Sequence, residues 1–316
     1  MTGYLIRRVG QALLVLWGAY TVTYFILYLL PGDTLSIMLS ASGMEADGLS
    51  AADLAKARAY YGLDKGLIAQ YFDLLGRALH GDLGQSLSLN RPVVDLLAER
   101  LPQTLSLAGL AIVLSLVGGV GLAYLTAYVQ WRPLKVALTR VPSFGFSIPV
   151  FWMGLLLIQV FAFGLGWFPA TGSKGFDSLV LPAITLAIPS AAVYAQVLQR
   201  GFHNVWQEPY IQTAFAKGLS RAQVQARHGL RNAALPILTL VGLQVGNTVS
   251  GAVLVETIFS RNGVGRLAQE AVLRQDIPVV LAIVAVSATA FVVINLIVDL
   301  LYPWLDPRIT HSPKVA

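Results

Sequence analysis

The stretch YIQTAFAKGLSRAQVQARHGLRNAALP, residues 210–236, is a polar and basic island between two long apolar runs. Pro209, just before it, suits the first position of a helix, where its missing N–H costs nothing. Lys217 and Gly218 fit the last turn of that helix and the glycine that commonly follows it. The stretch therefore predicts a first short helix that ends near residue 217.

A second helix start follows immediately. Ser220 with Gln223 three residues later is the pattern of a capping box, in which each side chain bonds the backbone of the other. Leu219 before the cap and Val224 after it fit the hydrophobic staple that accompanies such a start. The sequence thus predicts two short helices joined by a sharp bend at residues 218–220.

The composition on both sides of this island is that of a membrane protein. Of the 316 residues, 56% are hydrophobic and 12% are charged, and the mean hydropathy is +0.66. Soluble domains carry about 25% charged residues. The chain has no cysteine, which excludes disulfides, thiolate metal sites and cysteine nucleophiles.

Six apolar runs are long enough to cross a bilayer. The first follows Arg7 and Arg8, and its 22 residues would span a hydrocarbon core of about 30 Å as a helix. A signal peptide is the alternative, but its apolar region would be only about 7–15 residues long. The predicted spans are residues 9–30, 104–128, 142–163, 179–198, 233–255 and 277–302.

Basic and acidic residues are distributed unequally between the segments predicted on the two sides of the membrane. Residues 31–101 hold nine acidic and six basic residues, which places the segment outside, whereas twelve Lys and Arg residues fall in the inside loops and tails. The net charge of +6 therefore reflects topology rather than nucleic-acid binding, and both termini are expected in the cytoplasm. Within the outside segment we expect helices at 51–61 and 68–79 and a turn at 80–84.

Residues suited to bond chemistry are missing from the pattern. No phosphate-cradling P-loop occurs, and the four histidines show no metal-ligand spacing. We therefore expect no catalytic, cofactor or metal site on this chain.

A few polar residues fall inside or beside the apolar runs. Gln244 and Asn247 are candidates to line a translocation pathway, with interhelical hydrogen bonding as the alternative. Glu256, at the outer end of the fifth run, is a candidate contact for substrate or a binding protein, or else a plain surface carboxylate. Asn295 and Asp299, near the cytoplasmic end of the last run, are expected to be structural.

The island resembles a known family loop. Ala214, Gly218, the bend and the later Leu235-Pro236 are similar to the "EAA" loop of binding-protein-dependent ABC importer permeases, in the variant of the dipeptide, oligopeptide and nickel importers. Gln212 stands where the family usually has Glu. In that family the loop docks into a groove on a cytoplasmic ATPase. The resemblance implies an ATPase-coupling role for Gln212, Ala214, Lys217, Gly218, Leu219, Ser220 and Arg221.

The resemblance covers nearly the whole chain, through the motifs at residues 31–33, 81–86, 256–265 and 295–308. It implies an all-α integral membrane protein with six transmembrane helices, the type I (MetI-like) importer permease fold of a first-permease subunit, and a small helical extracytoplasmic insertion. The implied divisions are 1–30 (tail and first span), 31–101 (extracytoplasmic segment), 102–305 (permease core, with the coupling loop 203–232) and 306–316 (cytoplasmic tail).

The implied function is that of a permease subunit, without enzymatic activity, in an ATP-driven importer of the bacterial inner membrane. The implied partners are a second homologous permease, one or two ATPase subunits that carry ATP and magnesium, an extracytoplasmic binding protein, and lipid. Di- and oligopeptides are the expected substrates, with nickel or a metal–chelator complex as the alternative. Two other classes are less well supported. An intramembrane enzyme would need paired catalytic groups, and only Asp299 and single amides fall in the apolar runs. A secondary transporter would show inverted repeats or intramembrane carboxylates, and neither is evident.

Overall fold

A computed structural model describes residues 2–29 and 66–305, and these residues contain helices and turns but no strand. The predicted all-α class is confirmed. The chain divides into two compact units, which are described separately. The first comprises residues 1–104 and 262–293, and the second residues 105–261 and 294–316.

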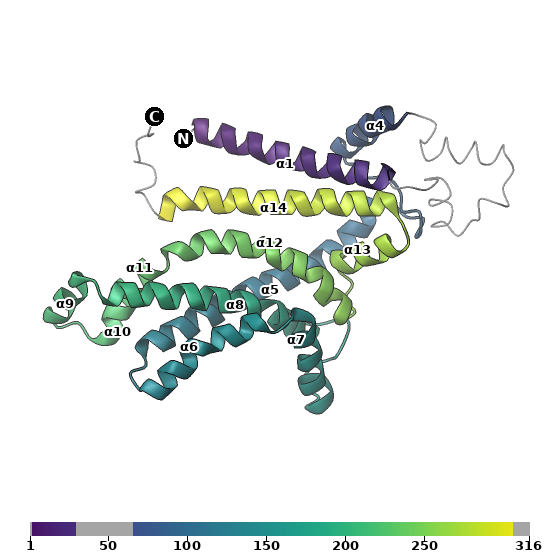
Figure 1. Cartoon of the computed structure of the whole chain (residues 1–316). Coiled ribbons are helices and arrows are strands. Elements are labelled where there is room, and N and C mark those ends of the chain that lie inside the picture. The colour runs from purple at the N-terminus through teal and green to yellow at the C-terminus, as the bar shows by residue number, and fades with distance from the viewer. Residues whose placement is uncertain (1, 30–65, 306–316) are drawn as a thin grey trace, which may run out of the picture. The chain divides into compact units, whose positions relative to one another are not determined.

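In the first unit, an aromatic cluster joins α1 (Thr2–Leu29) to α4 (Leu67–Leu79), the helix predicted at 68–79 (Figure 1). Tyr24 is fully buried, and its hydroxyl donates to the Leu67 carbonyl at 2.9 Å. The Tyr71 ring lies 5.3 Å from that of Tyr24 in an edge-on arrangement, a favoured geometry for aromatic pairs.

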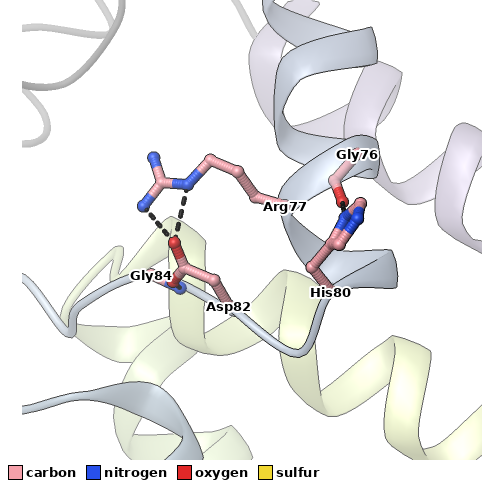
Figure 2. A network of polar contacts seen from close by, with 5 residues as sticks. All are labelled: Gly76, Arg77, His80, Asp82 and Gly84. Carbon is pink, nitrogen blue, oxygen red and sulfur yellow. Dashed lines mark hydrogen bonds and ion pairs between the residues drawn. The ribbon is translucent and has the colours of Figure 1, made fainter.

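The turn predicted at residues 80–84 follows α4, and Figure 2 shows how it is held. The Nε and Nη2 atoms of Arg77 each lie 2.8 Å from one Asp82 oxygen, and the other oxygen accepts the Gly84 N–H at 3.0 Å. The Gly84 N–H and Arg77 together hold the pKa of Asp82 below its usual value. His80 Nδ1 lies 2.8 Å from the Gly76 carbonyl oxygen. Gly84 has a φ of +80°, which favours glycine.

A buried carboxylate ties the region of this turn to the start of α14 (Ile277–Leu305). One oxygen of Asp276, which is 1% exposed, accepts the Ser86 hydroxyl at 2.6 Å and the Ser88 hydroxyl at 2.8 Å. Below it, the first turns of α5 (Val93–Tyr128) pack with α13 (Val264–Leu273) and α14 in one apolar cluster. These hydrogen bonds and this apolar cluster hold the residues around Ser86 and Ser88 against α13 and α14.

In the second unit, α8 (Asp177–Trp206) is the central helix. It approaches α5 closely at Gly119, where an added Cβ would lie 2.7 Å from the Tyr194 Cβ and 2.8 Å from the Ala191 carbonyl oxygen. Only glycine fits at this crossing, as expected for small residues between packed membrane helices.

The segment predicted as one span over residues 142–163 is broken. Here α6 (Arg132–Ser147) and α7 (Val150–Leu157) with its π-helical continuation η2 (Ile158–Gly164) meet at an angle of 104°. Ile148 is extended because it precedes Pro149, and a residue before proline avoids the helical region. Pro142, expected to open the span, lies inside α6.

Four helices in the described part of the chain are long and apolar enough to cross a membrane, and the bent pair would make five. The four are α5, α8, the part Arg7–Leu29 of α1 and the part Ile277–Ile294 of α14. Helix α12 (Leu235–Ile258) coincides with the predicted run 233–255 but is not among them. The six-span count therefore stays a prediction.

Some expectations fall outside the described residues. These are the helix at 51–61, the tail at 306–316 and the side chains of Asn295 and Asp299, whose backbone belongs to α14. Helix α5 begins at Val93, so it runs without interruption across the expected division at 101/102.

Candidate functional site

The island at residues 210–236 folds around the predicted bend. Helix α9 (Pro209–Ala216) has proline in its first turn, and Gly218 follows its C-cap with a φ of +80°. The Gly218 N–H donates to the Phe215 carbonyl at 2.9 Å and the Leu219 N–H to the Ala214 carbonyl at 3.3 Å. This pair of bonds is the Schellman motif, which satisfies carbonyls at the helix end.

The start of α10 (Arg221–Val224) is also as predicted. Gln223 N–H donates to the Ser220 hydroxyl oxygen at 3.4 Å, and Ser220 N–H donates to Gln223 Oε1 at 2.9 Å, which completes the capping box. Val224 is fully buried, and Leu219 packs against the same apolar cluster, as the staple requires.

The second predicted helix is not a separate short one. After α10 the backbone stays helical through the π-helical turn η3 (Gln225–Leu230) and α11 (Arg231–Ala233) up to α12. Gly229 lets this wide turn approach α8, because a Cβ there would lie 3.2 Å from the Phe202 ring. The bend at 218–220 is therefore joined to α12 by almost continuous helix.

The seven residues predicted to couple to an ATPase divide into two sets. Gln212, Lys217, Gly218 and Ser220 are exposed, whereas Ala214 is buried and Leu219 and Arg221 are half-buried. The first set forms a surface that a partner can contact, and the second attaches that surface to the rest of the unit.

Two side chains fasten the segment to the end of α5. Gln225 is fully buried and donates from Nε2 to the Tyr124 carbonyl at 2.7 Å. Arg221 donates to the Ala127 carbonyl at 3.1 Å, where a cation complements the C-terminal end of the helix dipole. Sequence reasoning missed Gln225, and its only signal is its place beside Val224 on the buried side.

Contacts to the end of α8 complete the attachment. The Arg221 guanidinium lies 4.6 Å from the centre of the Trp206 ring, a cation–π distance. Phe215 of α9 stacks on the same tryptophan, with ring centres 6.0 Å apart. A movement of α9 and α10 would therefore be passed to α5, α8 and α12 together.

Gln244 and Asn247, the predicted pathway residues, lie together on α12. Asn247 Nδ2 donates to Gln244 Oε1 at 2.6 Å, and both line a largely apolar cavity of about 410 Å³ with residues of α6, α7 and α8. The cavity is large enough for several atoms of a small solute, and its polar groups converge at one point.

Glu256 is neither a surface carboxylate nor part of that cavity. It is fully buried beside Arg261, which is 1% exposed and donates to the Ser178 carbonyl at 2.7 Å. Burial lowers the pKa of Arg261, and the charge of Glu256 raises it. The pair stabilises the loop after α12, and sequence reasoning missed the role of Arg261.

The comparison with known families decides the class. A family model described as the binding-protein-dependent transport system inner membrane component matches residues 101–311, and a model of its N-terminal part matches residues 1–108. The chain belongs to this family. It is a multi-pass component of the bacterial inner membrane that works with ATPase and substrate-binding subunits.

Relatives cover the full length of the permease. This chain is 36% identical over 315 residues to the glutathione transport system permease protein GsiC of Escherichia coli K12. The match covers 99% of this chain and 100% of the relative. The GsiC protein of Pectobacterium atrosepticum is also 36% identical over the same coverage. These relatives are transport permeases rather than enzymes.

Solved structures confirm the permease fold. An amino acid ABC transporter superposes with a TM-score of 0.53 at 19% identity, over 66% of this chain and 94% of that one. The MetNI methionine ABC transporter in an inward-facing form superposes with a TM-score of 0.53 at 14% identity, over 67% and 96%. The MetI-like core is thus shared.

Proposed function

We propose that this chain is one permease half of an ATP-driven importer of glutathione or short peptides. Its α9–α10 bend is the contact for the ATPase. A second homologous permease completes the pathway, and ATP with magnesium binds on the ATPase subunits. The observation that carries the proposal is the exposed bend, attached rigidly to three long helices within a family of binding-protein-dependent transport components.

Coupling follows from how the segment is built. The exposed face of Gln212, Lys217 and Ser220 would follow the ATPase as it closes on ATP. The Schellman turn and capping box hold the bend in one shape, so the displacement is not absorbed locally. Gln225 and Arg221 would then carry it to the end of α5.

Glutathione or a short peptide is the proposed substrate class because the full-length relatives are named as glutathione permeases. Nickel or a metal–chelator complex remains the alternative, from the family resemblance alone. The pathway would pass the cavity at Gln244 and Asn247, where amides can bond a peptide without a fixed charge.

Cross-linking tests the ATPase contact. The chain is naturally free of cysteine, so a single cysteine at Gln212 or Lys217 can be placed without background. In the assembled transporter either position should cross-link to the ATPase, whereas the exposed control Lys174→Cys, in the loop before α8, should not. Cross-linking of Lys174 alone would refute the assigned docking face.

Cysteine labelling tests the orientation. A further single cysteine at Ser220 is compared with Lys174→Cys. An impermeant thiol reagent applied to intact cells, with any outer membrane made permeable, should label Lys174→Cys and not Ser220→Cys. Labelling of the Ser220 position from outside would place the bend on the wrong side for an ATPase.

Uptake tests the substrate. The permease pair, the ATPases and the cognate binding protein would be reconstituted in liposomes, and uptake of labelled glutathione, dipeptides and Ni²⁺ would be compared. We expect ATP-dependent uptake of glutathione or dipeptides. Uptake of Ni²⁺ alone would favour the alternative while leaving the permease assignment intact.

A further inference from the structure

A second cavity, of about 750 Å³, lies in the second unit between the end of α5, α6, the last turns of α8 and the start of α10. Three cationic side chains line it from three different helices: Lys135, Arg200 and Arg221. We call it the basic pocket. It is separate from the cavity at Gln244 and Asn247, with which it shares no lining residue.

The basic pocket lacks negative charge. No aspartate or glutamate is among its lining residues, and none of its three cations forms an ion pair within the described part of the chain. Arg221 Nε and Trp206 Nε1 are buried there without an acceptor among the described residues. A group of cations with surplus donors favours an anion, because charge-assisted hydrogen bonds are the strong ones.

Its surroundings match the headgroup level of a membrane. The pocket lies at the ends of two membrane-length helices, α5 and α8, next to Trp206. Tyr128, the last residue of α5, is 45% exposed, and Trp131, just before α6, is 67% exposed. Tyrosine and tryptophan at the ends of spans are typical of the interface between headgroups and acyl chains.

Helix α6 has one polar face in the basic pocket and exposed apolar side chains on its other faces. Lys135, Thr139 and Ser143, spaced four residues apart, all line the basic pocket. The same helix exposes large apolar side chains, among them Leu134, Val141 and Phe144. A ligand with a charged head and an apolar tail can contact both faces at once.

We propose that the basic pocket binds the phosphate headgroup of an anionic phospholipid of the cytoplasmic leaflet. The phosphate oxygens accept hydrogen bonds from Lys135, Arg200 and Arg221, and the acyl chains lie along the apolar side of α6. Because Arg221 also holds the bend to α5, the lipid stabilises the attachment of the coupling segment. The inference rests on the membrane placement of the permease and not on its substrate.

Lipid retention tests the proposal without any transport measurement. The full transporter would be purified in detergent, incubated with dioleoyl phosphatidylglycerol or phosphatidylcholine, and examined by native mass spectrometry. Wild type should retain phosphatidylglycerol over phosphatidylcholine. The variant Lys135→Gln/Arg200→Gln should weaken that retention about tenfold or more, since it removes two hydrogen bonds to a charged group.

Matched variants separate a site from general charge attraction. Arg132→Gln removes an exposed cation from the first turn of the same helix, outside the pocket, and should retain the lipid. Lys135→Arg/Arg200→Lys keeps the charge and should also retain it, which controls for folding. Equal loss in Arg132→Gln, or unchanged retention in Lys135→Gln/Arg200→Gln, would overturn the site.

The source of the phosphate is decided by competition. Inorganic phosphate at millimolar concentration should not displace phosphatidylglycerol, because it lacks the acyl chains that contact α6. Displacement by phosphate would show that the pocket holds a small soluble anion and would overturn the lipid assignment. Lipid retained by the permease pair after the ATPase subunits are removed, but not by the full transporter, would show that an acidic segment of the partner fills the pocket and would overturn the lipid assignment.

Discussion

Gly218→Val is the sharpest test of the bend. Gly218 has a φ of +80° in a Schellman turn, and no atom lies within 4 Å of the position its Cβ would take. The penalty is therefore one of backbone conformation and not of a clash. A left-handed conformation costs an ordinary residue about 1–2 kcal/mol, and a β-branched residue more.

A cost of about 2 kcal/mol lowers the population of the intact bend about 30-fold relative to its alternatives. The bend is exposed, so no spanning helix is disturbed and the complex should assemble. The second arm, α10 through η3, would lose its fixed direction relative to α9. Ser220→Ala removes the cap at about 1 kcal/mol and should act more mildly.

The assay measures ATP turnover and uptake together in proteoliposomes with loaded binding protein. Gly218→Val should lose the stimulation of ATP turnover, or lose the ATPase itself. Gly218→Asn is the matched control, because asparagine tolerates this conformation and should keep much of the activity. If Gly218→Val retains full stimulation and uptake in an assembled complex, the bend is only a connector and the reasoning fails.

Three further predictions concern stability and titration. Gly119→Ala should destabilise the permease by about 1–3 kcal/mol, seen as a lower Tm, because its Cβ would lie 2.7 Å from the facing helix. Arg261→Met should cost about 3–5 kcal/mol by leaving Glu256 buried without its counter-charge. Adding Glu256→Gln should recover part of that loss, and a fully additive double mutant would contradict the pairing. Asp82 should titrate by NMR below its usual pKa, because the Gly84 N–H and Arg77 favour its charged form. Its stabilising contribution is present above that usual pKa and is lost as the pH falls through the folded-state pKa. Arg77→Gln should raise this pKa, and an unchanged midpoint would show that the ion pair does not act in solution.

Local chemistry made the bend predictable. Proline at the start of α9, glycine after its end and a serine–glutamine box at the next start act over a few residues, so the sequence alone specifies them. The same holds for the turn at residues 80–84, where Asp82 and Gly84 are neighbours in the chain.

Proline also explains the main error in the fold. Hydropathy sums over a window, so residues 142–163 read as one span although Pro149 breaks the helix within them. The continuation of α10 into α12 was also missed. The polar island and the apolar run from residue 233 were assigned to separate helices, whereas the backbone stays almost continuously helical through η3 and α11 into α12.

The composition and local patterns of the sequence indicated a membrane protein with a basic, polar bend between apolar runs, and the permease class came from the family resemblance. The membrane class and the bend were predictable because apolar length, charge asymmetry and capping patterns are local or additive properties. Only the tertiary structure decided that Gln225 reaches Tyr124, that Glu256 is buried with Arg261, and that Lys135, Arg200 and Arg221 share one pocket. Gln225 and Tyr124, and the three pocket cations, are far apart in the chain or lie on separate helices. Glu256 and Arg261 are only five residues apart, but their burial depends on the packing of α8 against the loop after α12. Their meeting depends on how the helices pack, which no local pattern encodes.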